Sequence, residues 1–250
     1  MEEKVNRCVS AATMRLAIDP PGRIDQSLCN RNKKMSFKAY AFDAYGTLFD
    51  VHAAVRRHSD TLGPAGQRLS ELWRTKQLEY SWVRSLMGSY TDFWRLTEEA
   101  LDFAIAATPG IDKAMRDPLL EAYWTLDCYP EVREVLTRLR ENGAATAILS
   151  NGSSDMLDAA VKSADLADLL DAVISVDAVK TFKTSPQVYQ MVTDTFDAQP
   201  GEISFQSSNR WDIAGAHKFG FHTVWVNRSG QPNEYHNYGP AREIGDLTAL

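Results

Sequence analysis

Four places in this 250-residue sequence combine an apolar segment with polar side chains that could do chemistry. Asp43 follows AYAF, Ser150 and Asn151 follow AATAIL, Lys183 lies in TFKTSP and Asp212 ends SSNRWD. A carboxylate can act as nucleophile or base, an ammonium group can offset its charge, and hydroxyl or amide groups can hold an anion. Taken singly, each residue also suits a helix cap, a solvated loop or a helical first turn. Their convergence at one edge of a fold would predict a catalytic site.

The elements that carry these residues alternate between strands and helices after Tyr129-Pro130. Short apolar runs separated by amphipathic stretches are typical of βαβ units and a parallel sheet. In such a sheet, ligands bind beyond the carboxyl ends of the strands, where the four polar positions fall. We expect strands at 37–42, 144–150, 172–175, 202–206 and 221–226, and helices at 131–142, 155–164, 186–196 and 211–219.

The segment between the first two strands is expected to contain helices and no strand. Apolar residues recur at helical spacing from Ser70 to a stop at Gly88. Further helices are expected at 52–62, 90–107 and 111–125, the last interrupted near Pro118. The sequence therefore predicts an α/β fold, a Rossmann-like parallel sheet flanked by helices with an all-helical cap inserted after the first strand. The predicted domains are a core of residues 35–50 and 127–250, a cap of residues 51–126 and a disordered N-terminal extension of residues 1–34.

Composition narrows the class of protein. The chain is 44% hydrophobic with a net charge of −6, so nucleic acid is not the expected partner. Three cysteines without a close pair fit a reducing compartment, and we expect a cytoplasmic protein. No apolar run is long enough for a membrane span, and no Cys/His cluster has zinc spacing.

The strand-end series resembles the haloacid dehalogenase superfamily. The segments DAYGTLFD, WRTKQLEYSWVRSLM, LSNGS, FKTSPQVY and SSNRWD are similar to the L-2-haloacid dehalogenase (type II) branch, over residues 37–228. The resemblance implies hydrolysis of short L-2-haloalkanoic acids to D-2-hydroxy acids through an aspartyl ester. The implied partners are a small 2-substituted carboxylate and water, with no cofactor and no metal.

One position separates this branch from the phosphatases of the superfamily. Phosphatases carry a second aspartate two residues after the nucleophile, and Tyr45 occupies that position here. Neutral Asn209 likewise stands where an acid could complete a Mg²⁺ site, and Mg²⁺ prefers carboxylates. A halide leaves as a stable anion and needs no proton. The pattern therefore favours displacement at carbon.

The resemblance assigns roles to individual residues. Asp43 would attack C2, Arg74 and Asn151 would bind the halide, and Ser150 would hold the substrate carboxylate. Lys183, supported by Tyr189, would offset the charges of Asp43 and Asp212. The implied catalytic residues are Asp43, Thr47, Arg74, Lys183, Ser207, Asn209 and Asp212, and the implied substrate-binding residues are Tyr45, Leu78, Phe93, Ser150, Asn151, Tyr189 and Trp211.

Four residues depart from the branch pattern, and they keep other functions open. Thr75, Thr184, Gln206 and Arg210 replace glutamine, proline, an apolar residue and a small residue, and three of them add polarity near the expected pocket. An added proton donor would suit a different leaving group at C2, as in ring opening of azetidine-2-carboxylate. A phosphatase and a non-catalytic binding protein are further alternatives.

Oligomerisation is a separate expectation. The resemblance implies a homodimer formed through the cap, with its aromatic residues Trp82, Tyr90 and Trp94 exposed.

Overall fold

A largely buried strand, β1 (Ala39–Phe42), lies at the centre of the fold. The computed structural model describes residues 37–250, so the predicted extension of residues 1–34 lies outside the described residues. Small and aromatic side chains suit a strand that is covered on both faces of a parallel sheet. The strand ends at Phe42, directly before Asp43, and Gly46 in the turn that follows adopts a φ of +95° and lets the chain turn sharply.

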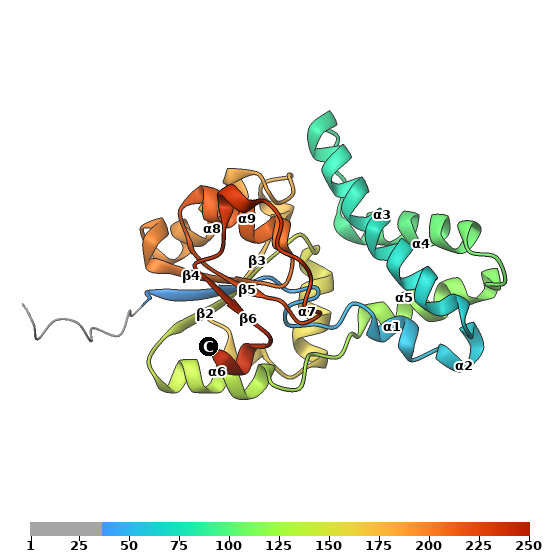
Figure 1. Cartoon of the computed structure of the whole chain (residues 1–250), viewed down its shortest axis with the longest axis horizontal. Coiled ribbons are helices and arrows are strands. Elements are labelled where there is room, and N and C mark those ends of the chain that lie inside the picture. Colours follow the sequence, from blue (N-terminus) through green and yellow to red (C-terminus); the bar gives the residue numbers. More distant parts are fainter. Residues whose placement is uncertain (1–36) are drawn as a thin grey trace, which may run out of the picture. The chain divides into compact units, whose positions relative to one another are not determined.

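The six strands of the sheet are all parallel, in the order β3-β2-β1-β4-β5-β6 (Figure 1). β1 lies between β2 and β4, in a register that pairs Phe42 with Ile148 and Gln206. The carboxyl ends of these three strands therefore meet. The other strands are β2 (Ala145–Ser150), β3 (Ala172–Ser175), β4 (Ile203–Ser207), β5 (His222–Val226) and β6 (Arg242–Ile244).

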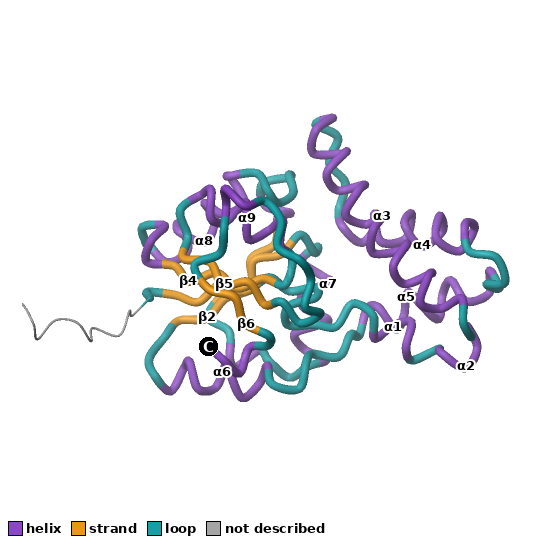
Figure 2. Tube along the Cα trace, viewed as in Figure 1, coloured by secondary structure: helices purple, strands orange, loops and turns teal. Residues whose placement is uncertain are grey.

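Helices cover the two faces of the sheet, with α8 and α9 on one side and α6 on the other (Figures 1 and 2). Their apolar stripes pack on the strands while their polar faces meet solvent. The α/β class and the parallel sheet are confirmed. The bounds of these helices are α6 (Val132–Glu141), α7 (Ser154–Ser163), α8 (Pro186–Phe196) and α9 (Arg210–Phe219).

The chain between β1 and α6 is helical, and residues 51–127 contain no strand. α3 ends at Gly88, which adopts the left-handed conformation with φ of 63°. α4 begins where the Asp92 side chain accepts a hydrogen bond from the Arg95 backbone N–H at 2.9 Å. The helices are α1 (Ala53–Arg56), α2 (Ser59–Leu62), α3 (Ala65–Met87), α4 (Phe93–Ala107) and α5 (Arg116–Trp124).

Three sequence predictions of elements were wrong in detail. The single helix expected at 52–62 is two short helices, because the chain turns at Arg57, whose guanidinium donates to the carbonyls of Ala122 and Thr125. The helix expected at 111–125 with an interruption near Pro118 is interrupted slightly earlier, at Arg116, where a short 3-10 helix gives way to α5. β6 was not predicted at all, because it has three residues of which only Ile244 is buried.

None of the helices in the described part of the chain is both long enough and apolar enough to cross a bilayer. Cys128 is a free, half-buried thiol. The other two cysteines lie outside residues 37–250.

Candidate active site

Lys183 joins two carboxylates at the carboxyl edge of the sheet. Its ammonium Nζ lies 2.9 Å from Asp43 Oδ1 and 2.7 Å from Asp212 Oδ2. The side chains of Lys183 and Asp212 are fully buried, and that of Asp43 is 7% exposed. Burial by itself lowers the pKa of Lys183, but attraction to Asp212 and Asp43 outweighs it and raises the pKa overall. Lys183 therefore stays charged and offsets both acids.

The second oxygen of Asp43 is held by three donors from two strand ends. Asp43 Oδ2 accepts hydrogen bonds from Thr47 Oγ1 at 3.1 Å, Ser207 Oγ at 3.3 Å and Asn209 Nδ2 at 2.7 Å. Backbone N–H groups fix two of these donors, because Ser208 N donates to Thr47 Oγ1 and Asn209 N donates to Ser207 Oγ. The carboxylate is thereby held in one orientation, with Oδ2 surrounded by donors and Oδ1 beside Lys183.

Asp212 has the properties of a base. Burial raises the pKa of Asp212 to about 6, and the charge of Asp43 adds to the rise, while Lys183 and Tyr189 oppose it. A carboxyl group with such a pKa can take a proton from water near neutral pH more readily than an ordinary aspartate.

Tyr189 contacts Asp212 and is linked to Lys183 through that carboxylate. Its hydroxyl donates to Asp212 Oδ1 at 2.9 Å, and its ring is fully buried against Phe205, Phe219 and Phe221. Because Tyr189 on α8 is fully buried, it reaches Asp212 from the protein interior.

Arg74 on α3 reaches the turn that follows β1. Its Nη2 donates to the Tyr45 carbonyl at 3.3 Å. The ring of Tyr45 is buried between aromatic side chains, with Tyr123 stacked at 5.8 Å and Phe93 at 6.4 Å between ring centroids. Burial raises the pKa of Tyr45 well above its usual range, so its hydroxyl stays neutral. Tyr123 on α5 was missed in the sequence, because a lone tyrosine in a helical segment carries no motif.

The two donors after β2 have defined partners. Ser150 Oγ accepts from the Gly152 backbone N–H at 3.0 Å, and Asn151 Oδ1 accepts from the Lys183 backbone N–H at 2.9 Å. The predicted apolar residues come from three helices. Phe93 is buried at the start of α4, Leu78 lies one turn beyond Arg74 on α3, and Trp211 packs edge to face against Trp82.

Three of the four departures from the branch pattern do not bring polarity to Asp43. Thr75 is exposed on α3 and donates back to the Glu71 carbonyl. Gln206 points to the face of the sheet opposite Ser207, where it donates to Ser204 Oγ. The Arg210 guanidinium donates to Asn233 and to the carbonyls of Tyr235 and Tyr238, so it fastens the C-terminal loop.

Thr184, the fourth departure, comes directly after Lys183 in the sequence. It is exposed and lies beside Gly215. The expectation that the departures add polarity around the leaving group was wrong for Thr75, Gln206 and Arg210. It was wrong because each of these three side chains points away from Asp43 toward hydrogen-bond partners elsewhere. A ring-amine substrate was suggested by added polar groups near the leaving group, and these three residues do not supply them.

The side chains around Asp43 do not fit a magnesium site. Within residues 37–250, no three His, Cys, Asp or Glu side chains lie close enough together to hold a metal ion. At the positions where further acids would be needed, Tyr45 is a buried neutral phenol and Asn209 donates its amide N–H to Asp43. Hard divalent cations need oxygen ligands there.

Comparison with known proteins agrees with this geometry. A model of the haloacid dehalogenase-like hydrolase family matches residues 37–220. The chain is 47% identical over 216 residues to (S)-2-haloacid dehalogenase 4A of Burkholderia cepacia, covering 86% of this chain and 94% of that protein. A dehalogenase crystal structure is similar with a TM-score of 0.84 and 46% identity, covering 86% of this chain and 96% of that one.

A second solved structure contains a covalent adduct. The L-2-haloacid dehalogenase from Xanthobacter autotrophicus with chloropropionic acid covalently bound is 37% identical, with a TM-score of 0.77, covering 84% of this chain and 95% of that one. The family match spans most of the chain and includes the strand ends that carry Asp43, Lys183 and Asp212. The chain therefore belongs to the haloacid dehalogenase-like hydrolase family.

Proposed function

We propose that this protein hydrolyses short (S)-2-haloalkanoic acids to D-2-hydroxy acids through an ester on Asp43. The observation that carries the proposal is the environment of the Asp43 carboxylate. Three donors hold Asp43 Oδ2 in place, and the Lys183 ammonium offsets the negative charge of the carboxylate from the side of Oδ1. A carboxylate fixed in this way is a suitable nucleophile for covalent catalysis. The similar proteins named (S)-2-haloacid dehalogenase support the choice of substrate.

The first step is displacement at carbon. Asp43 Oδ1 forms a bond to C2 of the substrate from the side opposite the halogen, and the halide leaves with the bonding electron pair. The configuration at C2 is inverted. Arg74, whose guanidinium lies at the Tyr45 turn, attracts the departing halide, and Asn151 stands beside Lys183 to share this role. A halide needs no proton, so neutral Tyr45 suffices where a phosphatase has an acid.

The second step is hydrolysis of the ester. Asp212 takes a proton from water, and the hydroxide attacks Cγ of Asp43. The negative charge that develops on Oδ2 is stabilised by Thr47, Ser207 and Asn209, which already point at that atom. The bond between Cγ and Oδ1 then breaks, and Asp212 gives its proton to the departing oxygen while the carboxyl group formed on Asp43 loses its proton to solvent. The hydroxy acid therefore carries away the old Asp43 oxygen, and the water oxygen stays on Asp43.

The roles of the two predicted domains follow from this chemistry. The core of residues 35–50 and 127–250 carries the nucleophile and the base, and Ser150 with the amides after Asp43 holds the substrate carboxylate. The cap of residues 51–126 supplies Arg74 for the halide, and with Trp211 of the core its Leu78 and Phe93 form the apolar wall.

We also infer a homodimer formed through the cap, on a face that shares only Trp82 with the expected one. Tyr90 donates to Asp177 and packs on Phe182, and Trp94 packs on Trp124, so these two aromatics are already engaged within the protein. Trp82 remains partly exposed beside Trp211. The large apolar side chains that face solvent on α3 and α4 are Trp82, Val83, Leu86, Met87 and Phe103.

Charged substitution at Met87 tests this face. Met87→Glu should convert a dimer to a monomer in light scattering, whereas a monomeric parent protein at micromolar concentration would refute the inference. A cytoplasmic location is inferred from the cysteine content, and cell fractionation would test it.

Halide release from (S)-2-chloropropionate tests the proposed function. The parent protein should release chloride and Asp43→Asn should not, because the amide is a poor nucleophile. Failure of the parent protein to release any halide would sink the proposal. A single turnover in ¹⁸O-water should place the label in the Asp43 carboxylate, and label found only in the hydroxy acid would reject the ester route.

A further inference from the structure

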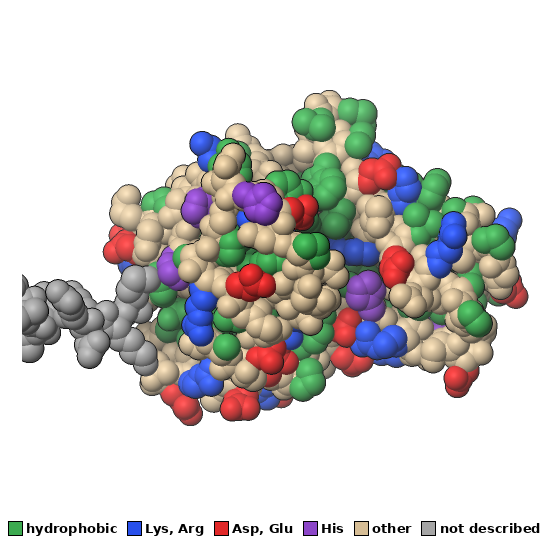
Figure 3. Space-filling view, viewed as in Figure 1, with side chains coloured by type: hydrophobic (Ala, Val, Ile, Leu, Met, Phe, Trp, Pro, Cys, Tyr) green, Lys and Arg blue, Asp and Glu red, His purple; other side chains and the backbone are tan. Residues whose placement is uncertain are grey.

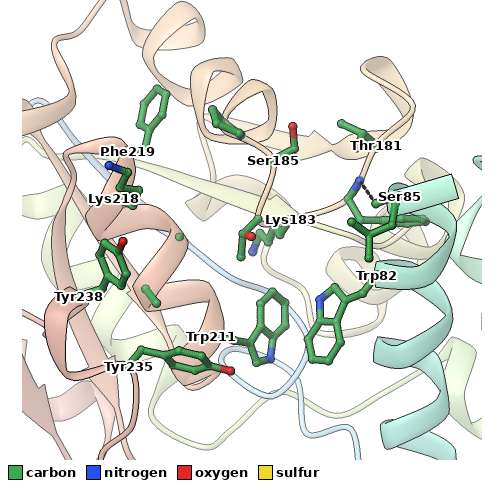
Figure 4. A pocket seen from close by; sticks show the side chains of 16 residues that line it. Trp82, Ser85, Thr181, Lys183, Ser185, Trp211, Lys218, Phe219, Tyr235 and Tyr238 are labelled. Atoms are coloured by element: carbon green, nitrogen blue, oxygen red, sulfur yellow. Dashed lines mark hydrogen bonds between the residues drawn. The ribbon is translucent and has the colours of Figure 1, made fainter. Parts of the chain in front are cut away.

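A large groove lies between the end of α3 and the α8–α9 side of the core, separate from the polar network at Asp43. Its volume is about 910 Å³, within the range of small-molecule sites. Its walls include Trp82 and Leu86 from α3, Trp211 and Ala214 from α9, and Tyr235 from the C-terminal loop (Figure 4). On the face drawn in Figure 3, hydrophobic side chains gather where α3 meets the core.

The walls of the groove expose apolar surface that the fold does not need for its own packing. Leu86 is 89% exposed, and Tyr235 and Trp82 are 47% and 38% exposed. Aromatic and aliphatic side chains left open around a cavity mark a binding surface for an apolar ligand.

The groove adjoins the site at Asp43. Lys183 is among the residues that line the groove, and its fully buried ammonium binds Asp43 and Asp212 behind that wall. Trp211 lines the groove one residue before Asp212, and its ring lies next to that of Trp82 beneath Lys183 in Figure 4, with centroids 5.5 Å apart.

A single face of α3 also runs from one site to the other. Arg74, Leu78 and Trp82 follow each other at four-residue spacing, so they lie one above the next on the helix. With a rise of about 1.5 Å per residue, Arg74 and Trp82 lie about 12 Å apart along the axis. A ligand that begins at Arg74 and follows this face therefore arrives at the Trp82–Trp211 pair and then in the groove.

We propose that the groove binds the distal part of a long alkyl chain carried on C2 of the 2-haloacid substrate. The inference rests on the proposed function and extends its substrate class from short acids to acids of about ten carbons. An extended chain covers about 1.2 Å per bond, so the eight-carbon chain on C2 of such an acid covers about 10 Å of the roughly 12 Å from Arg74 to Trp82 and brings its end to the Trp82–Trp211 pair. The carboxylate and halogen stay at Asp43, and the chain follows the Arg74–Trp82 face of α3.

Comparison of (S)-2-bromopropionate with (S)-2-bromodecanoate tests the inference. Each methylene that enters an apolar site contributes about fourfold to binding, so the decanoate should show a KM at least about tenfold lower. Turnover of the short acid together with failure to turn over the long one would overturn the inference and leave the proposed function intact. Failure with both acids would remove the proposed function and the inference with it.

Ala214→Phe fills the groove, because Ala214 lines it from α9. This variant should lose at least about tenfold in kcat/KM for bromodecanoate and stay within about twofold for bromopropionate. Ala106→Phe makes the same change at an exposed position on α4 that does not line the groove, and it should match the parent protein on both substrates. Equal effects of Ala214→Phe on the two acids would refute the route.

Inhibition of the unmodified protein gives an independent readout if Ala214→Phe fails to fold. Decanoate should compete with bromopropionate at a concentration at least about tenfold below that needed for propionate, and equal inhibition by both acids would overturn the inference. A second copy of the chain seated in the groove would instead make the bromodecanoate activity fall as protein concentration rises, and that result would also overturn it.

Discussion

Removal of the Tyr189 hydroxyl is expected to move the acid limb of the pH–rate profile to higher pH. The hydroxyl donates to Asp212 Oδ1 at 2.9 Å and favours the ionised form of that carboxyl group. A hydrogen bond to a charged group contributes about 1.5–3 kcal/mol, and one pKa unit corresponds to about 1.4 kcal/mol. Tyr189→Phe should therefore raise the pKa of Asp212 by about 1–2 units from its value of about 6.

The sign of the effect follows from the role of Asp212. As a base it must be ionised, so kcat falls as the pH drops through its pKa. In Tyr189→Phe the fall in kcat should begin at higher pH. The loss of kcat relative to the parent protein should be large near pH 6 and smaller at higher pH, where Asp212 is ionised in both proteins. The Phe ring retains the packing against Phe205 and Phe221, so the variant should fold.

The assay is halide release from (S)-2-chloropropionate across the pH range, with kcat determined at each pH. Tyr40→Phe is the matched control, because Tyr40 lies on β1 and packs on Phe37 at the opposite end of the strand from Asp43. Its acid limb should coincide with that of the parent protein. An unmoved limb in Tyr189→Phe would refute Asp212 as the base, whereas a uniform loss at every pH would mean that Tyr189 acts only through the fold.

Three further changes separate packing from charge. Gly152→Ala should lower the free energy of unfolding in urea by about 1–3 kcal/mol, because an added Cβ would lie 2.7 Å from the Tyr45 ring. Gly201→Ala is the control, since an added Cβ there meets open space and should leave the stability unchanged. Equal stability of the two variants would contradict this expectation. Lys183→Met should destabilise the protein by about 3–5 kcal/mol at pH 8, since it leaves two buried carboxylates unneutralised. The loss should be smaller at pH 5, because without Lys183 the pKa of Asp212 rises and its neutral form is cheaper to bury, and a loss that grows on acidification would argue against the ion pair. Arg210→Met should make the C-terminal loop sensitive to limited proteolysis while kcat changes less than about threefold, and an intact loop with lost activity would place Arg210 in the active site instead.

The sequence by itself determined the convergence of Asp43, Lys183 and Asp212. Alternating strands and helices predict a parallel sheet, and the carboxyl ends of parallel strands meet at one edge. Residues placed directly after those strands must therefore come together, whatever the details of packing. The same reasoning located the long helix that ends at Gly88, because periodicity and a glycine stop are local signals.

Only the tertiary structure decided which atoms meet. Asn209 donates to Asp43 across 166 positions of the chain, and Tyr189 reaches Asp212 from inside the core. Gln206 and Arg210 stand in the expected segment, but strand alternation turns one away from the pocket and the C-terminal loop captures the other. These directions depend on contacts between distant segments, which no local pattern encodes.

The groove along α3 is the clearest case. Its walls come from α3, α9 and the loop that carries Tyr235, segments more than 100 residues apart at the extremes. The sequence marked Trp82 as a dimer contact and Trp211 as a pocket wall, and it could not show that their rings meet at 5.5 Å. Helical spacing fixed which residues share a face, while the packing of α3 on the core decided what that face adjoins.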